Sequence, residues 1–140
     1  MKLLIGLALG LGMYFSASAQ SIPTLAKVYS GNTVETSMNA SKKNPKTQTQ
    51  NVPATVTVIK QEGQHVEFIY KNASYQAFEI GTISADGKMM QVAYQGGAGN
   101  YSISGNKLVG CGCSGRVREG AFSQWINSYY AWCDDLTAGK

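Results

Sequence analysis

The sequence predicts a mainly β protein: a small antiparallel up-and-down meander of about seven to eight strands that closes into a barrel, with one C-terminal amphipathic α-helix. Three observations lead to this fold class. Apolar and polar residues alternate from Val52 onward. Glycine- and asparagine-containing turn signals separate the alternating segments at roughly the eight- to twelve-residue spacing of short barrel strands. Near residue 121 the apolar spacing changes to that of a helix.

Each predicted strand is an alternating row that ends at a turn signal. Asp86–Gly87 is the strongest such signal, because both central residues of a type I′ turn need positive φ. On the strand before it we expect Phe78 and Ile80 to share the buried face. The predicted strands are Lys27–Thr36, Val52 to the turn at Gln61–Gln64, His65–Lys71, Tyr75–Ser84, Met89–Tyr94, Tyr101–Ile103 and Lys107–Gly110.

Two segments are predicted to be loops. Ser37–Asn51 has no apolar periodicity, so we expect a long exposed loop there. It contains the one cluster of basic residues, at Lys42, Lys43 and Lys46, with no aromatic residues between them. Nucleic-acid surfaces normally combine a broader basic face with aromatic residues, so we expect no nucleic-acid partner. Gly96–Asn100 is glycine-rich and is expected to be a flexible turn.

The last part of the chain is predicted to be a helix over Ala121–Leu136. Its apolar residues recur at helical spacing, and strict alternation fails over the same stretch. We expect the aromatic stripe to dock on the barrel wall or to cover one end of the barrel. The stripe consists of Phe122, Trp125, Ile126, Tyr129, Cys133 and Leu136.

The first nineteen residues are predicted to be a secretory signal peptide, which leaves residues 20–140 as a single domain. Lys2 precedes an uncharged apolar run at Leu3–Phe15, and Ala17–Ala19 matches the small-x-small cleavage pattern. A membrane anchor is the alternative, but the run is shorter than the ~20 residues of a spanning helix and contains three glycines. We therefore expect an exported protein, periplasmic or secreted, that does not span the membrane after cleavage.

Three cysteines predict at least one disulfide, because exported proteins meet an oxidising environment. Cys111 and Cys113 are too close in sequence to bond without strain, so Cys133 is the expected partner. We favour Cys113–Cys133, with Cys111 as the alternative partner, as a link between the last strand and the helix. Such a bridge closes a loop of about twenty residues, for which the chain-entropy model gives ~3 kcal/mol.

The sequence contains no familiar catalytic motif, and we predict no catalytic residue, cofactor or metal. Neither a G-x-S-x-G nor an H-E-x-x-H pattern occurs. Two alternatives involve the cysteines: a zinc site completed by His65, and a Cys-x-Cys redox centre near Arg116 and Arg118. An enzyme whose site is assembled from distant residues is the third functional hypothesis.

The leading hypothesis is a non-catalytic binding protein for a small apolar or aromatic ligand, because small barrels can enclose one ligand. The alternative role of the candidate aromatic residues is simply to fill the core. The architecture resembles lipocalin-like and avidin-like barrels in strand count and C-terminal helix. The lipocalin Gly-x-Trp signature is absent, since Val28–Gly31 stands near its place, so no residues are carried over. The ligand-binding candidates are Phe68, Tyr70, Phe78, Tyr94, Tyr101 and Trp125.

The second hypothesis is an envelope protein-binding or inhibitor domain that acts through exposed loops. Asn39–Gln50 and Gly96–Asn100 are the candidate recognition segments, because loops on a rigid scaffold often carry recognition. An outer-membrane barrel is disfavoured, because most predicted strands are short and their outward rows are polar. Loss of Lys2 with the leader lowers the formal net charge from +4 to a mildly basic +3.

Overall fold

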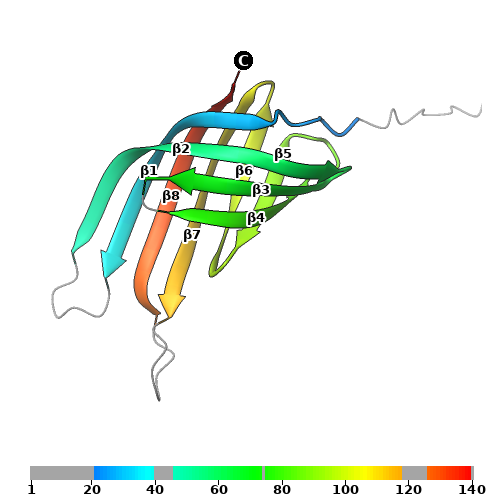
Figure 1. Cartoon of the computed structure of the whole chain (residues 1–140). Coiled ribbons are helices and arrows are strands. Elements are labelled where there is room, and N and C mark those ends of the chain that lie inside the picture. The colour runs from blue at the N-terminus through cyan, green and yellow to red at the C-terminus, as the bar shows by residue number, and fades with distance from the viewer. Residues whose placement is uncertain (1–20, 40–45, 74, 118–125, 140) are drawn as a thin grey trace, which may run out of the picture.

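The chain forms a closed antiparallel barrel of eight strands in the computed structural model, which describes residues 21–39, 46–73, 75–117 and 126–139 (Figure 1). The predicted β meander and its closure are confirmed. Neighbours in the barrel follow chain order. The strands are β1 (Val28–Asn39), β2 (Thr47–Glu62), β3 (His65–Asn72), β4 (Gln76–Ile83), β5 (Met89–Tyr94), β6 (Gly97–Ser104), β7 (Lys107–Val117) and β8 (Ile126–Ala138).

The barrel closes where β1 pairs with β8. Tyr29 lies opposite Ala138 in this register, and the pairing continues to the far end of both strands. Elsewhere each strand pairs with the next one along the chain, and the connections from β2 through β7 are short. Gly87 and Gly105 have positive φ, 70° and 58°, as the tight turns predicted at these positions require. No described strand therefore has an unpaired edge along the barrel wall, which is how barrels avoid edge-to-edge aggregation.

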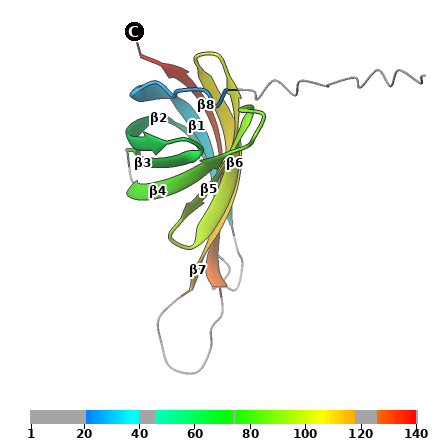
Figure 2. The ribbon, with the colours of Figure 1, turned by 90° about the vertical axis from the view of Figure 1, so that its right-hand side faces the viewer.

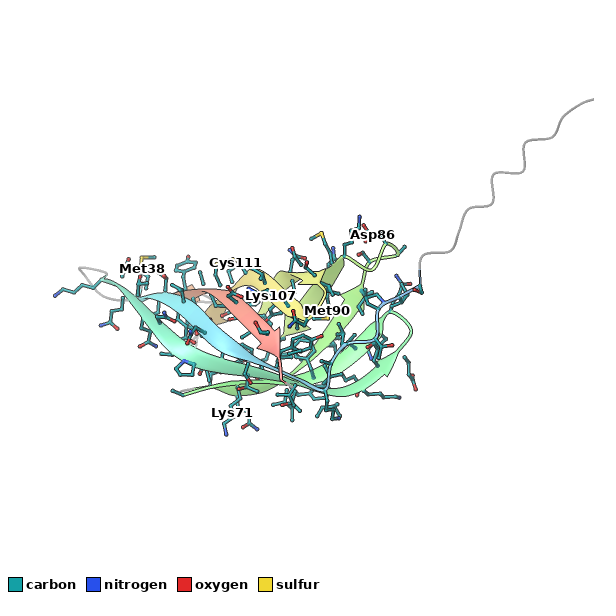
Figure 3. The ribbon with its side chains drawn as sticks, turned by 90° about the horizontal axis from the view of Figure 1, so that it is seen from above. Met38, Lys71, Asp86, Met90, Lys107 and Cys111 are labelled. Atoms are coloured by element: carbon teal, nitrogen blue, oxygen red, sulfur yellow. A yellow bond between two sulfur atoms is a disulfide. The ribbon has the colours of Figure 1, made fainter. Side chains whose placement is uncertain are left out.

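One end of the barrel, called the proximal end here, is closed by the segment at residues 21–27. The Leu25 N–H donates to Gln61 Oε1 at 2.9 Å, and Gln61 Nε2 donates to the Pro23 carbonyl at 2.8 Å. The interior at this end is a dense apolar core. Figure 3 shows Met90 inside the barrel and Asp86 at the proximal end. Further core residues are Tyr29, Val56, Val66, Phe68, Ile83, Leu108 and Leu136.

The opposite end, called the distal end here, is extended by β1, β2, β7 and β8, which run beyond the shorter strands (Figures 1 and 2). Met38 lies there, far from Asp86 (Figure 3). The prediction of a loop over Ser37–Asn51 is wrong at both ends, since Ser37 pairs with Gln48 and the segment from Thr47 onward belongs to β2. This part of β2 lacks the apolar–polar alternation that predicts a strand, because residues 46–51 are exposed on both faces of the sheet. Residues 40–45 lie outside the described residues.

The predicted C-terminal helix is wrong over residues 126–136, which form most of β8. The rest of the predicted helix, residues 121–125, lies outside the described residues. Pairing with both β7 and β1 gives β8 two partners, and this tertiary context overrides the helical spacing. The part of the chain that the structure describes contains no helix, and therefore none that is long and apolar enough to cross a membrane.

Two further predictions need correction. Phe78 and Ile80 point outward on β4 and are 56% and 47% exposed, because it is Glu79 and Gly81 that face the interior. The expected flexible turn at Gly96–Asn100 is mostly strand, since β6 begins at Gly97 and pairs with β5 and β7. That segment therefore belongs to the barrel wall rather than to an exposed recognition loop.

Candidate functional site

The structure places four of the six predicted ligand-binding residues inside the barrel. Phe68 and Tyr101 are fully buried, Tyr70 is nearly so, and Tyr94 is partly buried beside the core. Phe68 belongs to the apolar core, whereas the three tyrosines face the distal half. Phe78 lies on the outer surface and Trp125 lies outside the described residues.

Sequence reasoning missed three buried acids, which we call the acidic cluster: Glu35 on β1, Glu79 on β4 and Asp134 on β8. They are 2%, 4% and 2% exposed. Each occupies an inward position of its strand, in phase with buried neighbours. Acids are almost never fully buried unless they are paired. Fold stability alone therefore does not explain why the distal half of the interior contains these three acids.

Asp134 lies at the centre of this half and accepts hydrogen bonds from two tyrosines. The hydroxyl of Tyr101 donates to Oδ2 at 2.5 Å, and that of Tyr70 donates to Oδ1 at 3.5 Å. Burial raises the pKa of Asp134, and burial beside this carboxyl also raises the pKa of Tyr101 well above its usual value. The two tyrosines thus hold the carboxyl in place without neutralising its charge.

Glu35 joins the interior to a cavity at the distal end. Its Oε1 accepts from Asn72 Nδ2, and its Oε2 accepts from Gln50 Nε2 at 2.8 Å. The cavity has a volume of about 380 Å³. Its lining is polar and comes from the extended parts of β1, β2 and β8: Glu35, Ser37, Gln48, Thr49, Gln50 and Tyr130.

Glu79 is the most perturbed acid of the cluster. Burial, and then the nearby Asp134, raise its pKa from 4.5 to about 8. Its Oε2 is buried and has no hydrogen-bond partner among the residues that the structure describes. Buried polar atoms are nearly always satisfied, so such an atom needs a specific explanation.

Three tyrosines pack around Trp132 in the distal interior, and we call these four residues the aromatic wall: Tyr70, Tyr94, Tyr101 and Trp132. The Trp132 Nε1–H donates to the Tyr94 hydroxyl at 2.7 Å. Ring centroids of Tyr70, Tyr94 and Tyr101 lie 6.4, 6.3 and 5.4 Å from that of Trp132. These distances lie within the ~4.5–7 Å range of favourable aromatic pairs.

Glycines on β6 and β7 make room for the indole ring. A Cβ added at Gly99 or Gly112 would lie 2.7 or 2.5 Å from Trp132 Cζ2, closer than real contacts allow. Trp132 therefore lies flat against a stretch of bare backbone. The glycine-rich composition of this region reflects close ring packing rather than flexible turns.

No lysine or histidine side chain that the structure describes balances the acidic cluster. Every described lysine is exposed, and so is His65, which pairs with Glu67 at 3.2 Å on the outer surface. The hydrogen-bond partners of Glu35 and Asp134 are neutral amides and hydroxyls. Three carboxyls thus share one interior with only neutral groups and with each other.

The disulfide joins Cys111 and Cys133, so the favoured Cys113–Cys133 pairing is wrong and the alternative partner is correct. The reason is register: Cys111 lies opposite Cys133 on β7 and β8, whereas Cys113 lies opposite Ala131. Cys113 is free and exposed. The zinc alternative loses two of its ligands to this bond, and the described residues contain no group of three or more potential metal ligands.

Compared with known proteins, the chain matches no family model, no curated protein and no solved structure. The fold and the site therefore define its class by themselves. It is a small closed antiparallel barrel, fastened by a disulfide on its outer face, with an apolar proximal core and an acidic, aromatic distal interior.

Proposed function

We propose that the protein is a non-catalytic binding protein that holds one small ligand in the distal half of its barrel. The observation that carries the proposal is the acidic cluster buried against the aromatic wall. Burying unpaired carboxyls costs several kcal/mol in general, and the same positions filled with apolar residues would give a more stable barrel. Perturbed acids in such an interior are characteristic of functional sites.

The contrast between the apolar proximal half and the acidic, aromatic distal half of the interior indicates the chemical class of the ligand. The proximal half is filled by side chains such as Phe68 and Leu108, which leaves no place there for a purely apolar ligand. At the distal end, Glu35 lines a cavity of about 380 Å³, a volume within the ~300–1,000 Å³ range of small-molecule sites, and the residues of the aromatic wall do not line it. We therefore infer a ligand with a polar group for the acidic cluster and an apolar or aromatic body for the aromatic wall.

We also propose that the protein is exported. The predicted leader, residues 1–19, lies outside the described residues, so support comes from the Cys111–Cys133 disulfide, which is typical of oxidising compartments. N-terminal sequencing of the protein isolated from its host is expected to begin at Gln20. Recovery of a chain that still carries Met1, in a reducing compartment, would contradict export.

Ligand binding is tested by nuclear magnetic resonance with a fragment set that contains cationic, neutral and anionic aromatic and aliphatic molecules. The indole N–H of Trp132 is the reporter, because it bonds the Tyr94 hydroxyl inside the candidate site. We expect some fragments to shift this signal, and Trp132→Phe assigns it. Fragments that shift only outer-surface residues, or no fragment that shifts the indole, would refute the proposed site.

A further inference from the structure

We infer that the ligand is a small organic cation with N–H donors, a primary or secondary ammonium or a guanidinium, bound between Glu79 and Asp134 with its body against the aromatic wall. This inference rests on the proposed function and specifies its ligand. It comes from three features of the distal interior: the charge of the acidic cluster, the unpartnered oxygen of Glu79 and the faces of the surrounding rings.

The first feature is charge. Glu35, Glu79 and Asp134 lie in one interior, and none has a cationic partner among the side chains that the structure describes. Neighbouring carboxyls make ionisation of two of them harder, since burial and then Asp134 raise the pKa of Glu79, and burial and, to a smaller extent, Glu35 raise that of Asp134. A bound cation reverses this repulsion, whereas a neutral ligand leaves it in place and an anion worsens it.

The second feature is the hydrogen-bonding state of Glu79. Its Oε2 is an acceptor without a donor, although the side chain is 4% exposed and faces inward from β4. An ammonium or guanidinium N–H supplies that donor and forms a charge-assisted hydrogen bond. A quaternary ammonium has no N–H and cannot do so. The unpartnered oxygen of Glu79 therefore favours cations with an N–H group over quaternary ammonium ions.

The third feature is the aromatic wall. Trp132 is the ring type that attracts cations most strongly, and Tyr70 and Tyr101 stand beside it. Cation–π attraction is larger where water is excluded, as it is around these buried rings. The ring carbons also offer apolar surface for the carbon body of the ligand, although the rings are tilted by 32–50° to that of Trp132. A cation with an aliphatic or aromatic body thus suits both the carboxyls and the rings.

We assign ligand entry to the distal cavity, which neither Glu79 nor Asp134 lines. Glu35 lines the cavity and, through Oε1, also accepts from the buried Asn72. An entering cation therefore meets one carboxyl before it reaches the other two. Since Glu35 alone of the three acids lines the cavity, we assign this residue to entry and Glu79 and Asp134 to direct contact.

The test is calorimetric titration of the full protein with matched probes: phenethylammonium, 2-phenylethanol and 3-phenylpropionate, and the butyl series of the same three groups. We expect at least one ammonium to bind roughly tenfold or more tightly than its alcohol, and the carboxylates not to bind. Glu79→Gln and Asp134→Asn should each weaken the ammonium by roughly tenfold or more and leave the alcohol unchanged.

Asp135→Asn is the matched control. It removes the same charge from the next position on β8, where the carboxylate is exposed and pairs with Lys107 at 3.5 Å on the outer surface. We expect Asp135→Asn to bind the ammonium within about twofold of the wild type, because water and salt screen an exposed charge on the outer surface from the interior. A loss equal to that of Asp134→Asn would show that net charge, not the acidic cluster, drives binding.

A second measurement needs no variant. Since the pKa of Glu79 is about 8, the site holds a proton at pH 7 that an ammonium must displace. The groups that interact with Glu79 are Asp134, Tyr94 and Tyr101. Titrations in phosphate and in MOPS, which differ in ionisation enthalpy and contain no primary or secondary ammonium, should show release of up to about one proton per ammonium bound.

The two proposals fail separately. If no ammonium binds more tightly than its alcohol, or if binding releases no proton, the cation inference is overturned. The proposed ligand-binding function is then decided separately, by whether neutral or anionic fragments shift the Trp132 indole signal. If no fragment shifts that signal, the proposed function fails and the cation inference fails with it.

Discussion

Replacing Glu79 with glutamine should make stability less dependent on pH. Glutamine has the shape of the protonated acid but cannot ionise. Because burial and Asp134 raise the pKa of Glu79 to about 8, the native state binds a proton that the unfolded chain releases at any pH between 4.5 and about 8. Stability from this group is therefore fully present below 4.5 and decreases as the pH rises through that window.

The magnitude follows from the two pKa values. Their difference, from 4.5 to about 8, corresponds to about 5 kcal/mol at about 1.4 kcal/mol per pH unit. This is an upper limit, because water entry and relaxation around an ionised Glu79 reduce the cost. Many small domains have a total stability of only ~5–15 kcal/mol, so the wild type should be clearly weaker at pH 9 than at pH 5.

The assay is urea unfolding at pH 5, 7 and 9 with the disulfide intact, followed by tryptophan fluorescence. We expect Glu79→Gln to match the wild type within about 1 kcal/mol at pH 5 and to exceed it by several kcal/mol at pH 9. Glu62→Gln serves as the control, because Glu62 is exposed and pairs only with Lys60. A difference between Glu79→Gln and the wild type that is the same at pH 5 and pH 9 would refute the reasoning.

Three further variants test the disulfide, the close packing of the Trp132 indole against glycine, and the apolar core. Replacing both Cys111 and Cys133 with serine should lower the free energy of unfolding in urea by about 3 kcal/mol, since the bridge spans 22 residues. Gly112→Ala should cost about 1–3 kcal/mol and shift the fluorescence of Trp132, which the new methyl group displaces. Phe68→Ala should cost about 3–5 kcal/mol by leaving a cavity in the core, seen as a lower midpoint of thermal unfolding.

The disulfide and core variants each have a matched control. Cys113→Ser should leave stability within about 0.5 kcal/mol, because this thiol is exposed and unbonded. Phe78→Ala should be similarly mild, because the ring lies on the outer surface. If Phe68→Ala proves no worse than Phe78→Ala, the division into inward and outward faces is wrong. An unchanged indole spectrum in Gly112→Ala would contradict the close packing described for that glycine.

The sequence predicted the barrel well where the interior is apolar. Val66, Phe68 and Tyr70 alternate cleanly on β3, and all three point inward as expected. A turn at Asp86–Gly87 with positive φ at the glycine was also predicted correctly, but its type was not, because the Gly87 N–H donates to the Ser84 carbonyl at 2.9 Å and Gly87 is therefore the last residue of the turn. In the proximal half, burial, alternation and turn chemistry agree with one another, so one pattern is enough to locate each strand.

Prediction failed where the interior is acidic. Along β8 the inward row is Tyr130, Trp132, Asp134 and Leu136, and the acid breaks the hydrophobic alternation that marks a strand. The same happens on β4, where Glu79 is buried between two exposed apolar residues. The acidic interior contains residues that a hydrophobicity pattern assigns to solvent, so the candidate site and the errors coincide.

The pairing register between strands fixes which residues point inward, which the hydrophobicity pattern of a single strand does not. Phe68 lies opposite Glu79, so the inward direction of one fixes that of the other. The short connection after Asn72, where the Asn72 N–H donates to the Tyr75 carbonyl at 2.9 Å, sets this pairing. A strand assignment based on that turn would have placed Glu79 inside. The disulfide is a similar case, since two residues along β7 separate the correct cysteine from the favoured one.

Closure of the barrel between β1 and β8 has a consequence for folding kinetics. Tyr29 and Ala138 meet across this seam although almost the whole domain separates them in sequence, and the Gly139 N–H donates to the Val28 carbonyl at 2.9 Å. Such non-local pairing gives a high contact order, and β-rich domains of this kind fold in roughly milliseconds to seconds. The β7–β8 hairpin needs no such closure, because its cysteines are only 22 residues apart. Oxidation of these two thiols can therefore precede the docking of β1 and supply a preformed edge onto which the first strand closes.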